Sequence, residues 1–567
     1  MHKKLYCERD NRVRYYVMPK RVVWSDNGSG KIENIDDLLE ANNKCCLLKS
    51  GATAGISFVL DFGAELNGGI RIDLSECHDV GAIAASRRVR FRIRFGESVS
   101  EVMGLPSQDH AVHDTVLELP FWSIQEFGLT GFRFVRLDLL EQNLIVSIRS
   151  IKAVALERPF EYKGRFESSD PLLDQIWLTG ARTTHLCCQD YILDGIKRDR
   201  LVWIGDIHPQ IHIIVNAFGN EDIVPKSLNF LRDQMLPGHW MNDISSYSMW
   251  WILSVWDWYW YSGDKEFLRS QAAYLEELID HFVSKIDPSG REMFGGYFMD
   301  CIDPSEKQQL EGIRFLDWAS DGDHVAIAEG LQALFVWSMS VAQKIYGELA
   351  DPIMHDKCRV AVERLRSAPL THTKNKQVSA LRTICGISDP QITNASCLAI
   401  EPSKGLSTWF AYYVLQARAM AGDYCGCLDL IRSFWGGMSS LGATTFWEHF
   451  DEAWLHNAGR IDEITPVGKH DVHAEYGYNC FKGLRHSLCH GWAGGPTAWL
   501  SQNVLGVQPV APGFREVIIK PNLGNLTFAK GVVPTPFGLI TVSHKRQADG
   551  TIHTEYDVPT DVNVSNK

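Results

Sequence analysis

The sequence predicts a multidomain protein in which a central region of paired helices, closed into a toroid, lies between an N-terminal antiparallel β-sandwich and a small C-terminal β-sheet. Residues up to about 160 alternate apolar and polar side chains with a period of two, as half-buried strands do. From about residue 170 to 505, apolar positions instead recur at helical spacing. After residue 505, prolines interrupt short apolar runs, which is typical of strand edges and turns. Because 567 residues exceed what one hydrophobic core accommodates, we expect domains over 1–160, 161–505 and 506–567.

Residues 88–95 are the clearest strand of the N-terminal region. Four apolar residues, from Val89 to Phe95, alternate there with four arginines, from Arg88 to Arg94. This period predicts a strand with one buried apolar face and one solvated basic face. A site for an acidic glycan on the basic face is the less favoured alternative.

The helical region begins at Asp170, which is a good N-cap followed by Pro171 at the first helical position. Because no segment of β-propensity separates the helices, a parallel βαβ sheet is excluded. The long connections are rich in Gly, Asp, Trp and His, so we expect function there. Further helices are expected over 208–218, 246–261, 265–286, 322–347, 355–367, 405–420, 423–435 and 494–505.

The last 60 or so residues predict short strands around Ile519 and Ile540, with a turn at Thr535-Pro-Phe-Gly538. So few residues make a thin core, and we therefore expect this sheet to rest on a neighbouring domain.

Composition limits the partners. The formal net charge of −13 and the pI near 5.9 argue against a nucleic-acid surface. The sequence has no apolar run of 18 or more residues, so we expect no membrane span. The charged N-terminus lacks the apolar core of a signal peptide. The 14 cysteines form no CxxC pair and suit a reducing compartment. We expect a cytoplasmic protein, or a periplasmic or secreted one if a leader has been removed, and leave a homodimer open.

One stretch between the predicted first and second helices mixes three carboxylates with cations, an aromatic ring and large apolar residues. Carboxylates in such a setting suit a cleft in which one pKa is tuned, whereas the plainer interpretation is a loop with solvated ion pairs. The candidate site residues of this stretch are Asp194, Arg198, Asp199, Trp203 and Asp206.

Two later segments add further groups. Glu448 follows Trp447 in a loop-rich part of the chain, where a carboxylate suits acid/base work or, equally, the start of a helix. His490 lies beside Cys489, but we discount thiol catalysis because a working pair needs a third orienting group. Further aromatic and acidic candidates for contact with a ligand are Trp258, Asp317, Trp318 and Trp447.

Carboxylates beside aromatics favour a neutral polyhydroxylated ligand. The sequence contains no phosphate-binding loop, dinucleotide fingerprint, HExxH motif or Cys/His cluster at ligand spacing, so we expect no cofactor and no metal. Hydrolysis of a glycoside needs one carboxyl that delivers a proton to the leaving oxygen and a second that attacks or activates water.

Three separated motifs resemble those of the α-L-rhamnosidases of glycoside hydrolase family 78. They are Asp194-Gly-Ile-Lys-Arg-Asp-Arg-Leu-Val-Trp-Ile-Gly-Asp206, Gly442-Ala-Thr-Thr-Phe-Trp-Glu448 and His490-Gly-Trp492. The resemblance spans most of the chain. It implies an (α/α)6 barrel between β-domains that removes terminal α-L-rhamnose with inversion of configuration.

The resemblance also implies roles. The general acid maps onto Asp199 and the general base onto Glu448, while Asp194 and Asp206 match acidic positions that hold sugar hydroxyls. Trp203 and His490 match an aromatic and a histidine of the pocket. Many members have glutamate where Asp199 stands, often in a motif one residue longer. The alternatives are therefore a degenerate member that only binds glycans, and another glycosidase or a polysaccharide lyase on the same toroid.

Overall fold

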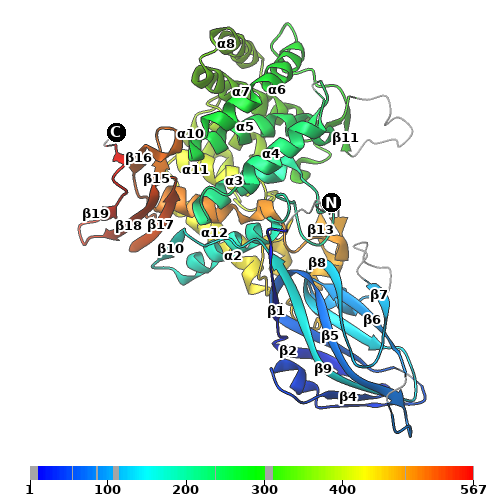
Figure 1. Cartoon of the computed structure of the whole chain (residues 1–567). Coiled ribbons are helices and arrows are strands. Elements are labelled where there is room, and N and C mark those ends of the chain that lie inside the picture. Colours follow the sequence, from blue (N-terminus) through cyan, green and yellow to red (C-terminus); the bar gives the residue numbers. More distant parts are fainter. Residues whose placement is uncertain are drawn as a thin grey trace, which may run out of the picture.

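The computed structural model describes residues 10–565 except 54, 85–86, 106–113, 237, 300–310 and 479–480. The N-terminal residues on which the expectation about a signal peptide rested lie outside the described part. A β-region (blue to cyan in Figure 1) projects from one side of a helical region, and the C-terminal strands (orange to red) pack against another side of the same helices.

The N-terminal region forms one continuous nine-stranded antiparallel sheet, in the order β3-β4-β9-β5-β8-β6-β7 with β1 beside β9 and β2 beside β5. The longest strand, β5, changes register at several places and pairs with β2, β8 and β9 along its length. The sheet therefore bends over a single apolar core. The strands are β1 Val13–Val17, β2 Arg21–Asp26, β3 Lys31–Glu33, β4 Cys46–Lys49, β5 Ser57–Asp79, β6 Val89–Gly96, β7 Asp114–Leu119, β8 Ser123–Leu139 and β9 Leu144–Glu157.

Strand β6 confirms the predicted alternation, since its four apolar residues are buried. Its arginines, however, do not form an open basic face. They pair with carboxylates of neighbouring segments, as Arg90 does with Glu141 and Arg92 does with Asp114. The acidic partners neutralise this face, which disfavours the alternative of a site for an acidic glycan.

The helical region is organised around a closed ring of six contacting helices among the described residues. In this ring α3 contacts α5, α5 contacts α7, and the series continues through α9, α11 and α14 back to α3. Other helices pack outside the ring. The helices are α2 Pro171–Cys187, α3 Ile204–Ala217, α4 Ile223–Gln234, α5 Ser245–Ser262, α6 Lys265–Ser284, α7 His324–Leu349, α8 Pro352–Ser367, α9 Lys376–Ile384, α10 Pro390–Thr393, α11 Ala411–Met420, α12 Tyr424–Ser440, α13 Val472–Glu475 and α14 Gly495–Trp499; the short α1 Val99–Met103 lies in the β-region.

Local signals explain where these helices begin. The Asp170 side chain accepts a hydrogen bond from the Leu172 backbone N–H, which confirms the predicted N-cap. Helix α9 was missed in the sequence because its buried face includes polar residues such as Gln377 and Arg382, which hide the apolar period. Helix α4 was also missed.

Helix α7 is long and apolar enough to cross a membrane by length and composition, which the sequence did not predict. The most apolar 18-residue window of this helix is 78% buried inside the protein. Its position in the ring accounts for that apolar character, because a ring helix contacts protein on most sides.

The C-terminal strands form two small sheets, and the predicted turn at Thr535–Gly538 joins β17 to β18. Their buried residues belong to the same apolar core as the helices, so the expectation that this region rests on a neighbour is confirmed. Strand β10, from the beginning of the helical region, also joins the first sheet beside β17. The strands are β10 Arg165–Ser168, β15 Val507–Pro509, β16 Glu516–Ile519, β17 Phe528–Thr535, β18 Gly538–Arg546, β19 Ile552–Asp557 and β20 Asn563–Val564, and the connections hold two short pairs, β11 Tyr297–Phe298 with β12 Ile313–Arg314 and β13 Gly477–Tyr478 with β14 Phe481–Lys482.

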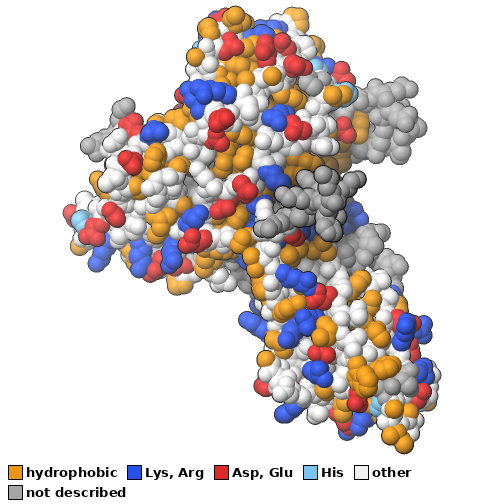
Figure 2. Space-filling model, in the orientation of Figure 1, with side chains coloured by type: hydrophobic (Ala, Val, Ile, Leu, Met, Phe, Trp, Pro, Cys, Tyr) orange, Lys and Arg blue, Asp and Glu red, His pale blue; other side chains and the backbone are white. Residues whose placement is uncertain are grey.

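Acidic and basic side chains are interspersed over the face of the molecule seen in Figure 2. The visible face carries no extended basic patch of the kind that binds nucleic acid.

Candidate active site

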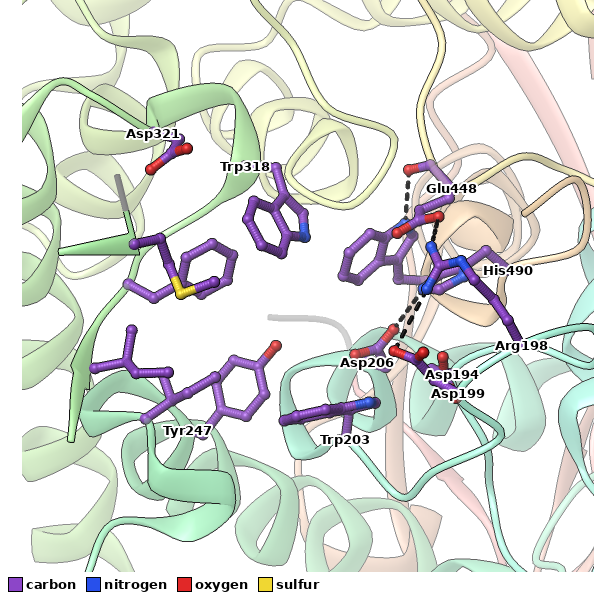
Figure 3. Close-up of a pocket in the computed structure, with 15 residues that line it drawn as sticks. Asp194, Arg198, Asp199, Trp203, Asp206, Tyr247, Trp318, Asp321, Glu448 and His490 are labelled. Atoms are coloured by element: carbon purple, nitrogen blue, oxygen red, sulfur yellow. Dashed lines mark hydrogen bonds and ion pairs between the residues drawn. The ribbon is translucent and has the colours of Figure 1, made fainter. Parts of the chain in front are cut away.

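A cavity of about 480 Å³ opens at the end of the ring where α3 and α5 begin. This volume lies in the range of small-molecule sites, about 300–1,000 Å³. Most of the labelled polar groups gather on one side, with Trp203 next to them, whereas Tyr247, Trp318 and Asp321 lie toward the other side (Figure 3). The lining residues are Asp194, Arg198, Asp199, Trp203, Asp206, Ile244, Tyr247, Met299, Ile313, Phe315, Trp318, Asp321, Glu448, His490 and Trp492.

The loop between α2 and α3 supplies most of the polar side. Asp194 fixes this loop, because its Oδ1 accepts a hydrogen bond from the Leu201 N–H at 2.9 Å. The Asp194 carbonyl accepts another from the Gly491 N–H at 2.7 Å. The first and third sequence motifs therefore meet through backbone contacts.

Arg198 links the loop to the second motif. Its guanidinium forms an ion pair with the Glu448 carboxylate and lies 3.4 Å from Asp199 Oδ2. Arg198 and Glu448 are 250 residues apart in the sequence, and both side chains are buried. The Asp199 side chain is 26% exposed, so this carboxyl is the more accessible of the two.

The backbone turns sharply at Asp199 and Arg200, where φ is 52° and 55°. Two successive side-chain-bearing residues in the left-handed region cost on the order of 1–3 kcal/mol each. Surrounding contacts hold the turn in place: the Arg198 Nε–H donates to the Arg485 carbonyl at 2.8 Å, and the Arg200 guanidinium donates to the Ile196 carbonyl at 2.8 Å.

The β-region supports this loop from behind. The Lys197 ammonium lies 3.2 Å from both Glu97 and Glu101, two buried carboxylates of the β-region. Glu97 also accepts a hydrogen bond from the Leu488 N–H at 2.7 Å, and the Gly131 N–H donates to the Ile196 carbonyl. The loop thus depends on residues far upstream in the chain.

His490 and Asp206 form a buried pair, with His490 Nε2 3.0 Å from Asp206 Oδ1. Burial raises the pKa of the Asp206 carboxyl, and burial also raises the pKa of Asp194 to about 8. Burial opposes the charged form of His490, but the neighbouring Glu448 and Asp206 carboxylates outweigh it and raise the pKa of His490.

Glu448 is held in its ionised form. Burial alone would raise the pKa of this carboxyl, but the charges of Arg198, His490 and His486 outweigh burial and keep the pKa well below its usual range. The Trp492 indole N–H donates to the Glu448 carbonyl at 3.0 Å, and the Ser487 N–H donates to Glu448 Oε2 at 3.3 Å. An ionised, fixed carboxylate facing a cavity can act as a base or a nucleophile.

The opposite side of the cavity is aromatic. Trp203 packs edge to face against Tyr247, with ring centroids 6.0 Å apart, and Phe315 packs edge to face against Trp318 at 4.9 Å. Trp492, whose indole N–H donates to the Glu448 carbonyl, stacks in parallel on the buried ring of Trp409. Such rings offer flat apolar faces to the C–H groups of a sugar.

The structure brings eight of the residues predicted for the site into this cavity and places three elsewhere. Trp258 is buried within α5, and Trp447 is buried against Phe450. Asp317 is fully buried, where its Oδ2 accepts a hydrogen bond from the Gln377 side chain, and burial raises the pKa of Asp317 to about 7. The two tryptophan rings are therefore part of the packed core, and the hydrogen bond from Gln377 holds the Asp317 carboxyl in its buried position.

Sequence reasoning did not identify Tyr247, Phe315, Ile313, Ile244 and Met299 as site residues. Apolar and aromatic side chains are common in cores, and nothing in the local pattern marks these as lining a cavity.

Two groups of side chains that could hold a metal ion lie outside the cavity among the described residues. The first is His208, His212 and Asp257, and the second is Glu97, Glu101 and His473. The Lys197 ammonium already supplies a positive charge to the second group.

Comparisons with known proteins match the chain to α-L-rhamnosidases, the same family that the three motifs resemble. The family model described as bacterial alpha-L-rhamnosidase 6 hairpin glycosidase domain matches residues 161–329, and that of the bacterial alpha-L-rhamnosidase C-terminal domain matches residues 506–565. A curated alpha-L-rhamnosidase from Alteromonas sp. (strain LOR) is 24% identical over 507 residues, which are 81% of this chain and 51% of that protein. The chain therefore spans about half the length of this curated relative.

Solved structures share the fold. A rhamnosidase of family GH78 from Bacillus sp. GL1 aligns over 93% of this chain and 55% of its own, with a TM-score of 0.73 and 20% identity. A rhamnosidase from Klebsiella oxytoca with rhamnose bound aligns over 87% of this chain and 96% of its own, with a TM-score of 0.68 and 18% identity. By the two matched domains, the curated relative and the shared fold, the chain is similar to the α-L-rhamnosidases of glycoside hydrolase family 78.

Proposed function

We propose that this protein is an exo-acting glycoside hydrolase that removes terminal α-L-rhamnose from glycans or glycosides with inversion of configuration. The observation that carries the proposal is the arrangement around Arg198. This side chain contacts both Asp199 and Glu448, so two carboxyls from distant motifs face one cavity of suitable size. Such a pair of carboxyls is what glycoside hydrolysis requires.

In this mechanism Asp199 delivers a proton to the glycosidic oxygen, and Glu448 removes a proton from a water on the opposite face of the sugar. The assignment follows the environment of each group. Glu448 is buried and its pKa is held low, so it stays ionised as a base must. Asp199 is partly exposed at the cavity, where a leaving group can reach it. Inversion requires the two carboxyls to lie roughly 6.5–9.5 Å apart, which leaves room for the water.

Other polar groups would hold the sugar. A pKa of about 8 leaves Asp194 largely protonated at neutral pH, so its carboxyl can donate a hydrogen bond to a sugar oxygen. The pair of His490 with Asp206 offers a donor and an acceptor beside it. Trp203 and Trp318 would pack against the apolar C–H groups.

The aspartate at position 199 is one methylene shorter than the glutamate of many family members. The left-handed backbone at Asp199 and Arg200 supports the view that the chain compensates through its backbone, because the Asp199 carboxyl still lines the cavity. A misplacement of about 1 Å would otherwise cost about 100-fold in rate.

We also propose that the ring of six helices with its outer helices is the (α/α)6 barrel of this family. The division at residues 160 and 505 remains part of this proposal. The pairing of β10 with β17 shows that the first residues of the helical region also contribute to the C-terminal sheet.

The test is hydrolysis of 4-nitrophenyl α-L-rhamnopyranoside by the wild type, Asp199→Asn and Glu448→Gln. We expect Glu448→Gln to lose about 10²- to 10⁴-fold in kcat, because the base is removed while the volume is kept. Wild-type activity retained in both variants would reject the assignment.

A catalytically degenerate member that only binds glycans is the second candidate, and the aspartate at position 199 is the observation that motivates it. A wild type that binds L-rhamnose but hydrolyses no α-L-rhamnoside would favour this candidate. Release of an unsaturated sugar that absorbs in the ultraviolet would instead favour a lyase.

A further inference from the structure

A second cluster of titratable side chains lies inside the helical ring. His208 and His212 are one turn apart on α3, and Asp257 comes from α5, the neighbouring helix of the ring. The Nε2 atoms of His208 and His212 lie 3.0 Å and 2.9 Å from Asp257 Oδ2. Three potential ligand atoms therefore converge on one point.

This cluster is separate from the cavity proposed for catalysis. Asp257 follows the cavity residue Tyr247 by ten positions on α5, which is roughly 15 Å along the helix. The rings of Trp250 and Tyr413 pack against His208, with centroids 5.0 Å and 5.8 Å from it. None of the three clustered side chains lines the cavity.

The other nitrogen of each histidine is already engaged. His208 Nδ1 lies 2.8 Å from the Tyr413 hydroxyl, and His212 Nδ1 lies 3.3 Å from the side-chain amide of Gln502. Histidines that bind metals nearly always hold their second ring nitrogen in this way, which orients the first toward the ion. The Tyr413 hydroxyl can hold His208 in this way. The Gln502 amide nitrogen faces His212, while its amide oxygen accepts hydrogen bonds from Tyr412 and Gln416, so this amide must turn before His212 Nδ1–H can donate to it.

One carboxylate oxygen faces both histidines. His208 is 1% exposed, and Asp257 Oδ2 lies within hydrogen-bonding distance of the Nε2 atoms of His208 and His212. The three atoms are close enough together to bind one ion, which would replace these direct contacts. The side chains of Asp257 and His212 are 18% and 11% exposed, which leaves a route for an ion to enter.

We propose that His208, His212 and Asp257 form a binding site for a divalent transition-metal ion such as Zn²⁺, which ties α3 to α5 inside the ring. Two imidazoles and one carboxylate are ligands that suit zinc and its neighbours, whereas Ca²⁺ and Mg²⁺ prefer oxygen ligands alone. A fourth position remains for a water. From the sequence we expected no metal: the His208-Pro-Gln-Ile-His212 spacing is present, but the third ligand comes from another helix.

The test uses the full chain stripped with EDTA and titrated with Co²⁺, followed by visible absorption, and with Zn²⁺, followed by calorimetry. We expect one ion per chain, displacement of Co²⁺ by Zn²⁺, and a higher Tm with metal. A wild type that binds neither ion would overturn the proposal and would show that the two histidines share protons with Asp257.

Variants locate the site. Asp257→Asn keeps the side-chain volume and should abolish binding, while Tyr413→Phe should weaken it by about 10- to 100-fold through the lost hydrogen bond to His208. The control is His553→Gln, which removes an exposed histidine 3.4 Å from a glutamate on β19 and should bind as the wild type does. Wild-type affinity in Asp257→Asn would contradict the assignment.

Discussion

The two sides of the cavity differ in how they are built. On the polar side, ion pairs join groups from distant parts of the chain: Arg198 with Glu448, His490 with Asp206, and Lys197 with Glu97 of the β-region. The aromatic side is made of aromatic side chains that pack against one another, as Trp203 does against Tyr247 and Phe315 does against Trp318. Under the proposed function, the polar side fixes the reacting groups, while the aromatic side shapes the space for the sugar. Variants on the two sides should therefore fail in different ways.

The largest effect is expected for Asp199→Asn acting on a substrate with a poor leaving group. A rhamnosyl disaccharide needs the proton, so we expect kcat/KM to fall by about 10²- to 10⁴-fold. A nitrophenyl rhamnoside leaves as a stable anion and should be affected far less. Kinetics on both substrates measure the difference, and equal losses on the two would indicate that Asp199 is not the proton donor.

Arg198→Met tests the electrostatic role of the polar side. Arg198 helps to hold the pKa of Glu448 low, so its removal should raise that pKa. Because Glu448 must be ionised to act as a base, the acidic limb of the pH profile of kcat/KM should move to higher pH, along with a loss of rate. Arg200→Met, on the same loop, is the matched control and should leave the acidic limb in place. An unshifted limb in Arg198→Met would refute the role.

On the aromatic side, Trp318→Ala should raise KM by about 10-fold with little change in kcat, because a stacked ring holds the substrate before and during the reaction alike. Trp122→Ala, at a 73% exposed position of the β-region, should have no effect on either constant. A large loss of kcat in Trp318→Ala would contradict the expectation that the two sides have different roles.

The smallest kinetic effect is expected for Glu97→Gln, which acts only through Lys197. We expect a few-fold loss of kcat and a destabilisation of about 1–3 kcal/mol, since a buried ammonium loses one of its carboxylates. Thermal unfolding and kinetics measure the two quantities. A loss of kcat as large as that of Glu448→Gln would mean that the β-region takes a more direct part.

The polar and the aromatic side of the cavity also differ in how far the sequence could predict them. The polar side comes from motifs in which carboxylates stand among apolar residues, an unusual pattern that marked Asp199 and Glu448. The aromatic side comes from residues such as Tyr247 and Phe315, whose type and spacing equally suit a core. Trp258 shows the converse, because a ring in an aromatic run became core rather than cavity.

For the fold, too, the features that local patterns encode were predictable, and those that depend on long-range contacts were not. Strand alternation at β6 and the N-cap at Asp170 are local signals, and the structure confirms both. The β-region forms one bent sheet because β5 pairs with several strands along its length, which depends on long-range register that no local pattern encodes. The support of Lys197 by Glu97 is likewise a contact between distant segments.

The central claim is that Asp199 and Glu448 act across the cavity to cleave an α-L-rhamnoside with inversion. Proton NMR of the hydrolysis of 4-nitrophenyl α-L-rhamnopyranoside tests it most directly, because the first sugar released is seen before its anomers equilibrate. The account predicts that β-L-rhamnose appears first and α-L-rhamnose later. α-L-rhamnose as the first product would contradict it.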